Sequence, residues 1–210
     1  NYDTDLFLPL TNDAASLLSS ADSANPSYKV IADHLRSASF LIADGVLPSN
    51  EGRGYVMRRI IRRALRHGHK LGSSEPFFHK LVPTLCAVMG DAYPLLMQTA
   101  DQIQRVLLKE EQQFELTLDQ GMKILDAAMA TLDGKVIPGE VIFKLYDTYG
   151  FPTDLTGDIA RENDLSLDMD GFDRSMQEQR TRARAASKFA GQAEAELALE
   201  IETDFIGYQA

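Results

Sequence analysis

Seven cations and no acid occupy residues 53–70, within the stretch PSNEGRGYVMRRIIRRALRHGHK at positions 48–70. They are Arg53, Arg58, Arg59, Arg62, Arg63, Arg66 and Lys70. A guanidinium presents a fixed fork of N–H donors that matches the oxygens of a phosphate or a carboxylate. These cations give +7 in a chain whose formal net charge is −10, so the remainder carries −17. The pattern predicts either phosphate binding or ion pairs with the chain's own acids.

Helical spacing gathers these cations on one side of an amphipathic helix. Arg58, Arg62 and Arg66 recur at i, i+4 and i+8, and apolar residues fill the opposite stripe. We expect the apolar stripe to face a core and the guanidinium groups to face out. Outward cations repel one another unless an anion neutralises them, which favours phosphate, and RNA helices present phosphates to a protein surface. A membrane surface is disfavoured because the apolar stripe is needed for the core.

A second unusual stretch is LYDTYGFP at residues 145–152, where two tyrosines and a phenylalanine surround Asp147 and a glycine turn. Aspartate side chains often cap turns by bonding to the nearby backbone. A rigidly held carboxylate can instead accept a hydrogen bond from a ligand. Both interpretations remain open from the residues alone.

The other reactive side chains predict no catalytic residue and no metal ligand. His67 and His69 flank Gly68 without a further cluster of histidine or cysteine. The single Cys86 excludes an intramolecular disulfide and fits a reducing compartment. No nucleophile with its base, phosphate-cradling glycine loop or pair of catalytic carboxylates is recognisable.

Apolar spacing predicts an all-α protein, an irregular helical bundle with one very long helix. The expected helices cover residues 5–22, 27–44, 53–70, 75–89, 92–132, a segment from about 139, a segment from 152 or 153, and 170–189. Ser49 or Asn50 is expected to cap the third of them. The acids of the long helix are expected to form a solvated face, namely Glu110, Glu111, Glu115 and Asp119. Alternation at residues 201–205 predicts the first strand of a following domain.

The ends of the sequence predict a piece of a longer cytoplasmic protein. No apolar run reaches the roughly 20 residues of a membrane span. The first residues, NYDTDLFLPL, lack the basic segment of a signal peptide, and the first residue is not methionine.

Two long stretches, VIADHLRSASFLIADGVLPSNEGRGYVMRRIIRRALRHG and LYDTYGFPTDLT, resemble the tRNA-recognition region of bacterial alanyl-tRNA synthetases. NYDTDLF at the start resembles the segment after the third signature motif of the class II catalytic domain. IETDFIGYQ near the end resembles the beginning of the family's editing domain. The resemblance covers nearly the whole chain. It departs at Gly52, where some relatives have asparagine, and residues 85–100 match no useful segment.

The resemblance implies a domain division and a set of cofactors. It implies that residues 1–26 are the tail of the catalytic domain, 27–135 a helical tRNA-recognition domain, 136–190 a second helical subdomain with the YDTYGFP turn, and 191–210 a linker to the editing domain. The family attaches alanine to tRNA using ATP and Mg²⁺, and its editing domain holds zinc. The motifs for these groups are absent from this chain, so we expect no cofactor, no metal and no alanine activation on the chain itself.

The family identifies its tRNA by a G·U wobble pair in the acceptor stem, using an asparagine and an aspartate. Asn50 and Asp147 match those motif positions. The resemblance implies that Asn50 donates to uracil, that Asp147 accepts from the guanine amino group, and that the seven cations contact phosphates. Its implied partners are the acceptor stem of tRNA(Ala) and the flanking domains of the same chain. The alternative is a helical module that docks an acidic protein partner through the arginine-rich helix.

Overall fold

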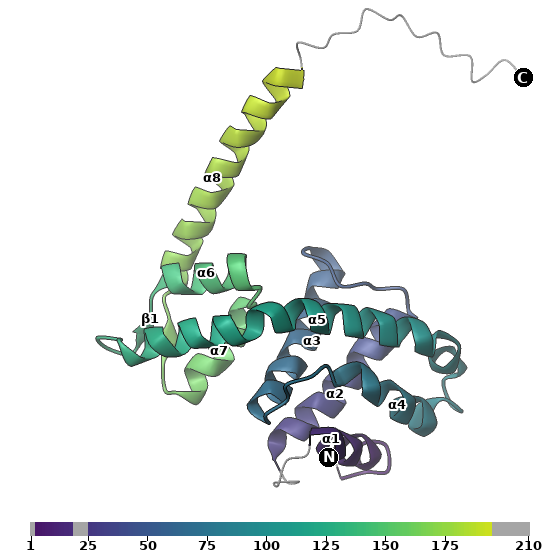
Figure 1. Ribbon diagram of the computed structural model, residues 1–210. Helices are drawn as coiled ribbons and strands as arrows, with labels where there is room; N and C mark the ends of the chain where they lie inside the picture. Colours follow the sequence, from purple (N-terminus) through teal and green to yellow (C-terminus); the bar gives the residue numbers. More distant parts are fainter. Residues whose placement is uncertain (1–2, 19–24, 195–210) are drawn as a thin grey trace, which may run out of the picture.

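The computed structural model describes residues 3–18 and 25–194, with side chains described as far as residue 184 (Figure 1). Within these ranges the elements are α1 (Leu8–Leu18), α2 (Pro26–Ala43), α3 (Gly52–Lys70), the 3₁₀ turn η1 (Phe78–Leu81), α4 (Val82–Met89), α5 (Pro94–Ala130), β1 (Val136–Ile137), α6 (Gly139–Tyr149), α7 (Thr153–Glu162), β2 (Ser166–Leu167) and α8 (Met169–Glu194). The predicted all-α class is confirmed. The strand expected at 201–205 and the linker from 195 onward lie outside the described residues.

The long helix α5 joins the two halves of the molecule. Its 37 residues span about 55 Å at 1.5 Å per residue, and it passes from the α1–α4 side to the α6–α8 side (Figure 1). Its buried stripe contains Ile103, Leu107, Phe114, Leu118 and Leu125. The expectation of a fully solvated acidic face is wrong, because Glu110 and Glu111 are each only 3% exposed.

In the first half, α2 and α3 pack against each other and against α5. Their buried apolar residues include Ile31 and Leu35 on α2, and Met57 and Ile61 on α3. Asn25 caps α2 by accepting a hydrogen bond from the Ser27 amide at 3.0 Å. The apolar stripe expected from the sequence therefore forms a core, which fixes the rotation of α3 about its axis.

The loop before α3 crosses tightly over the first turn of that helix. A Cβ at Gly54 would overlap the Leu47 carbonyl and the Ser49 side chain, so the close crossing requires a glycine. The expected side-chain cap is absent: Glu51 occupies the capping position, and the Ser49 hydroxyl donates to the Glu51 carbonyl at 2.8 Å. The crossing places Asn50 beside the start of α3.

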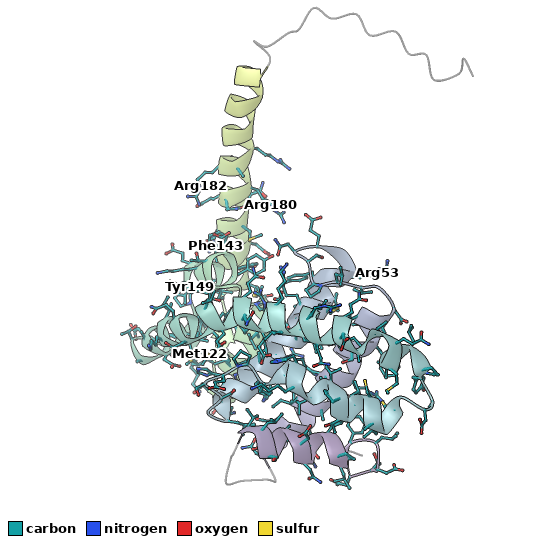
Figure 2. All side chains as sticks on the ribbon, turned by 45° about the vertical axis from the view of Figure 1, so that its right-hand side comes forward. Arg53, Met122, Phe143, Tyr149, Arg180 and Arg182 are labelled. Carbon is teal, nitrogen blue, oxygen red and sulfur yellow. The ribbon has the colours of Figure 1, made fainter. Side chains whose placement is uncertain are left out.

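In the second half, α6 packs between α5 and α8, and α7 lies against α3. A parallel pairing of β1 with β2 brings Val136 beside Ser166 and Ile137 beside Leu167. The C-terminal part of α8 projects away from the rest of the molecule, with Arg180 and Arg182 on different sides of the helix (Figure 2). Across the described residues, no helix combines the length and the apolar character that a bilayer crossing needs.

Candidate functional site

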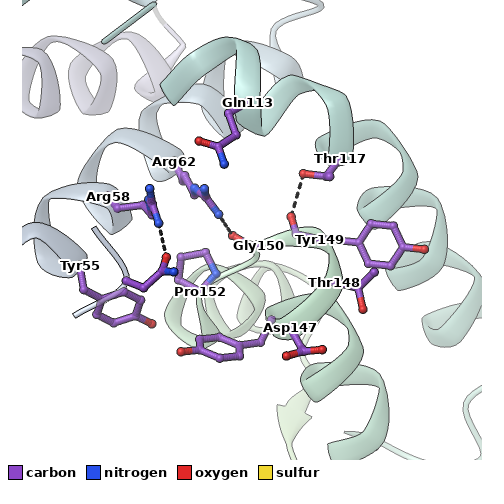
Figure 3. Close-up of a pocket in the computed structure, with 12 residues that line it drawn as sticks. Tyr55, Arg58, Arg62, Gln113, Thr117, Asp147, Thr148, Tyr149, Gly150 and Pro152 are labelled. Carbon is purple, nitrogen blue, oxygen red and sulfur yellow. Dashed lines mark hydrogen bonds between the residues drawn. The ribbon is translucent and has the colours of Figure 1, made fainter. Parts of the chain in front are cut away.

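A cavity of about 390 Å³ lies where the start of α3, the middle of α5 and the α6–α7 turn meet (Figure 3). Asn50 and Asp147 both line it, although they lie far apart in the sequence. The structure thus brings together the two side chains that the sequence selected as candidate readers of a ligand.

Asn50 lines the cavity as a hydrogen-bond donor. It is exposed at the end of the loop before α3, and Arg58 Nη1 donates a hydrogen bond to its Oδ1 atom (Figure 3). Because a guanidinium has only donors, the amide must turn its oxygen toward Arg58. The Nδ2 group makes no hydrogen bond to any residue that the structure describes, so it is free to donate to a ligand.

Asp147 lines the cavity as an acceptor. It is exposed in the last turn of α6, and among the described residues its carboxylate has no hydrogen bond and no ion pair. The turn that follows is closed without it. Gly150 takes the left-handed conformation at φ +69°, and the Phe151 amide donates to the Leu145 carbonyl at 2.9 Å. The alternative in which Asp147 caps the turn is therefore not what the structure contains.

The turn after Asp147 is anchored to α3 and α5 by its backbone. The Thr117 hydroxyl donates to the Tyr149 carbonyl at 2.9 Å, and Arg62 Nη1 donates to the Gly150 carbonyl (Figure 3). The buried Phe151 ring packs against Phe114 with ring centroids 5.6 Å apart. These contacts hold the wall that carries Asp147 at a fixed distance from α3.

A buried carboxylate lies behind the cavity. Glu110 on α5 contacts Arg58 Nε at 3.0 Å, and it contacts Arg62 at both Nε (2.8 Å) and Nη2 (2.7 Å). The Arg62 guanidinium also lies 4.8 Å from the centre of the Phe114 ring. Burial lowers the pKa of Arg62, and the nearby Glu110 charge opposes that shift. Glu110 thus compensates two cations beside the cavity.

Farther along α3, the cations pair with a row of acids on α7. Asp154 contacts Arg59 and Arg63 at 2.9 Å each, and Asp158 contacts Arg63 at 2.8 Å. Farther along α7, Glu162 takes two hydrogen bonds from the Arg66 guanidinium, at 2.6 and 2.8 Å, and one from Lys70 at 2.9 Å. The hydrogen bond from Arg66 is the main cause that lowers the pKa of Glu162 from 4.5 to about 2.

The expectation that all guanidinium groups face solvent is therefore wrong for Arg62 and Arg66, which are 7% and 5% exposed. The physical reason is that the second half of the molecule packs onto the charged face of α3 and supplies matching carboxylates. Of the seven cations, Arg53 alone has no ion pair within the described part of the chain, and it is exposed in the first turn of α3 (Figure 2).

Sequence reasoning missed Glu110 and the α7 acids, although both left a signal. Glu110 follows Ile103 and Leu107 and precedes Phe114 at helical spacing, which places it on the buried stripe of α5. Asp154, Asp158 and Glu162 recur every four residues in TDLTGDIARE, the same interval as the arginines.

Among the described residues, no three histidine, cysteine, aspartate or glutamate side chains are grouped so that they could hold a metal ion. The residues described here therefore offer no ligand set for the zinc that the family resemblance implies for a complete enzyme.

Comparison with known proteins identifies the family. The family described as tRNA synthetases class II (A) matches residues 1–210. Alanine–tRNA ligases of Chromohalobacter salexigens and Methylococcus capsulatus are 60% and 58% identical over 209 residues, and that of Pseudomonas entomophila is 57% identical over 208. The matches cover 99–100% of this chain and 24% of each relative, so the chain spans about a quarter of their length. The chain therefore belongs to the class II tRNA synthetase (A) family.

Proposed function

We propose that this chain recognises the acceptor stem of tRNA(Ala) through its G·U wobble pair, as one part of an alanine–tRNA ligase. The observation that supports this most directly is that a free donor, Asn50 Nδ2, and a free acceptor, the Asp147 carboxylate, line the same cavity. The family match and the names of the relatives agree with it.

The chemistry of the wobble pair fits these two groups. In a G·C pair the guanine 2-amino group bonds to cytosine, whereas in a G·U pair it projects unpaired into the minor groove. Asp147 would accept a hydrogen bond from that amino group. Uracil O4 remains an acceptor on the major-groove side, where Asn50 would donate. Each contact is expected to discriminate by about 1–3 kcal/mol, as in other base readout.

Six of the seven cations of α3 divide into two groups under this proposal, and the seventh, Arg58, instead bonds to Glu110 and Asn50. Arg53, Arg59, Arg63 and Lys70 keep enough exposed surface to contact phosphates, which would orient the stem without reading its sequence. Arg62 and Arg66 are buried and ion-paired, so their part is to hold the second half of the molecule against α3.

The remaining parts of the proposal concern the longer protein. We propose that residues 1–26 end a catalytic domain, that 27–135 form a helical tRNA-recognition domain, that 136–190 form a second helical subdomain with the YDTYGFP turn, and that 191–210 lead to an editing domain. The attachment of alanine to tRNA with ATP would be carried out by other parts of that protein.

Docking of an acidic protein partner is the alternative function for the arginine-rich helix. Such a partner would meet a face whose charge Asp154, Asp158 and Glu162 already largely neutralise. No observation favours this alternative.

The test compares binding of the chain to two acceptor-stem RNA duplexes that differ only in G·U against G·C, at two salt concentrations. We expect tighter binding to the G·U duplex, and Asp147→Ala should reduce that preference by about 5- to 150-fold, which is the share of one contact. Asp126→Ala, which removes an exposed aspartate on α5 away from the cavity, is the matched control and should keep the preference. Equal affinity for both duplexes would contradict the roles of Asn50 and Asp147, and no binding to either would contradict the proposed function.

A further inference from the structure

Glu110 is connected to both walls of the cavity, each time through one arginine. Arg58 contacts Glu110 and donates to Asn50 Oδ1, while Arg62 contacts Glu110 and donates to the Gly150 carbonyl. Glu110 itself is 3% exposed, so it has no route to a ligand of its own. We infer that Glu110 is a positioning residue that, through Arg58 and Arg62, orients the Asn50 amide and the turn after Asp147, and this inference rests on the proposed function.

On the Asn50 wall, the arginine selects one of two nearly equal orientations of the amide. An asparagine side chain has almost the same shape after its oxygen and nitrogen exchange places, so shape alone does not choose. A reader of uracil O4 needs the nitrogen toward the ligand. Arg58 enforces this because it can only donate, and Glu110 holds Arg58 in place through Nε at 3.0 Å.

On the Asp147 wall, the arginine holds the backbone. Arg62 Nη1 reaches the Gly150 carbonyl so closely that a Cβ at Gly150 would overlap it. Asp147 lies three residues before that carbonyl, in the last turn of α6. The position of Arg62, fixed by two contacts to Glu110, therefore sets how far Asp147 stands from α3.

The negative charge of Glu110 has a second effect, which is to keep the cavity arginines from pairing with Asp147. Asp147 is the one acid among the twelve described residues that line the cavity, and Arg58 and Arg62 line it too. With Glu110 present, both arginines have a carboxylate behind the cavity. Without it, two uncompensated cations would share the cavity lining with Asp147, and pairing with either of them would remove Asp147 as an acceptor for the guanine amino group.

The experiment uses Glu110→Gln in the 210-residue chain, which keeps the size of the side chain and removes its charge. Glu111→Gln is the matched control. Glu111 is the next residue of α5 and is also 3% exposed, but it binds the Phe77 and Phe78 amides at 2.7 and 2.9 Å instead of the cavity arginines. Both variants should lose stability. Only Glu110→Gln should lose the preference for G·U over G·C RNA, by about tenfold or more.

A second readout does not depend on RNA. The measurement is the ¹⁵N resonance and heteronuclear NOE of the Asn50 side-chain amide in the free protein. The amide should be ordered in the unchanged chain and in Glu111→Gln, and it should average between orientations in Glu110→Gln. If the Asn50 amide responds in this way but neither the unchanged chain nor any variant prefers G·U RNA, the positioning role stands and the proposed function fails.

An unchanged Asn50 amide and an unchanged G·U preference in folded Glu110→Gln would overturn the inference. Should Glu110→Gln not fold, Arg58→Lys replaces it as the test, because Arg58 is partly exposed and lysine keeps the positive charge. A lysine ammonium cannot bond to Glu110 and Asn50 at the same time in the way that the forked guanidinium does. Arg58→Lys should disorder the Asn50 amide and lower the G·U preference at least fivefold, and a normal amide and preference in it would overturn the inference.

Discussion

At the scale of single residues, Gly150 meets two demands that no other residue type satisfies together. Its φ of +69° lies in the left-handed region, and its missing Cβ leaves the space that Arg62 Nη1 occupies. Gly150→Ala should therefore lower the free energy of unfolding by about 2 kcal/mol or more, since strain at positive φ alone costs about 1–2 kcal/mol. Urea unfolding followed by circular dichroism measures this loss.

Gly45 provides the control for that prediction. It follows the C-cap of α2 at φ +83°, and a Cβ there would meet nothing within 4 Å. Gly45→Ala should show the conformational strain alone, about 1–2 kcal/mol. Equal losses at the two glycines would mean that the approach of Arg62 does not depend on the absence of a side chain.

His67 makes the stability of the chain depend on pH below neutrality. Burial, followed by the nearby Arg66 charge, lowers its pKa from 6.5 to about 4. The unfolded chain therefore takes up a proton at a higher pH than the folded chain, so the stability from neutral His67 is complete above pH 6.5 and is lost as the pH falls toward 4. His67→Gln should flatten the decline of the unfolding free energy across this window.

Even in His67→Gln, the unfolding free energy should still decline somewhat as the pH falls, because of His34. Burial also lowers its pKa, so it contributes to the same decline. Urea titrations at pH 7.5, 5.5 and 4.5 measure the difference between the variant and the unchanged chain. The same slope in both would exclude His67 as a source of the pH dependence.

At the scale of elements, the pairing of α3 with α7 resembles a ladder of carboxylates and cations. Glu162 is its last carboxylate, bonded to Arg66 and Lys70. Because its pKa is lowered to about 2, its contribution to stability is complete above pH 4.5 and disappears as the pH falls through 2. The Glu162 side chain is 37% exposed, so solvent weakens the pairs and the contribution should be about 1 kcal/mol.

Glu162→Gln tests this contribution. The difference in unfolding free energy from the unchanged chain should be about 1 kcal/mol at pH 7 and should shrink below pH 4.5. Glu140→Gln, at an exposed acid on α6 with no ion pair in the described part of the chain, should differ little at either pH. A difference for Glu162→Gln that persists unchanged at pH 2.5 would contradict the charge-based account.

The periodic elements could be predicted from the sequence because each shows its own apolar spacing, as α3 and α5 do. The groups that surround the charged side chains of these helices could not be predicted from the sequence. A stripe of arginines looks the same whether water, RNA or another helix covers it, and α7 covers it with acids whose spacing matters only once the two helices are side by side. The two-residue strands left no pattern long enough to detect.

The same distinction applies to the candidate site. Asn50 and Asp147 were selected by motif resemblance, and the structure places both on one cavity. As an acid on a long helix, Glu110 is expected in solvent, although its position on the apolar stripe of α5 indicates burial, and the structure buries it.

At the scale of the whole molecule, most of the basic helix is already neutralised, which limits how strongly salt can affect RNA binding. Four of the seven cations retain exposed surface for phosphates, namely Arg53, Arg59, Arg63 and Lys70. With a slope of about −0.9 per phosphate contact for duplex DNA, the plot of log K against log salt should have a slope of about −2 to −4. Binding measured at several salt concentrations gives this slope, and a value near −6 would mean that RNA displaces the internal ion pairs.

The short pairing of β1 with β2 has a further consequence for how this architecture can be altered. Parallel strands require a long crossover connection. Here that connection is the whole α6–α7 segment, whose two ends lie side by side in the paired strands β1 and β2. We expect that a segment whose two ends lie side by side can be exchanged between homologous proteins without rerouting the polypeptide on either side, provided that its contacts to α3, α5 and α8 are kept. This segment contains Asp147 together with Gly150 and the α7 acids, so a graft would transfer one wall of the cavity and the countercharges that α3 requires as a single unit.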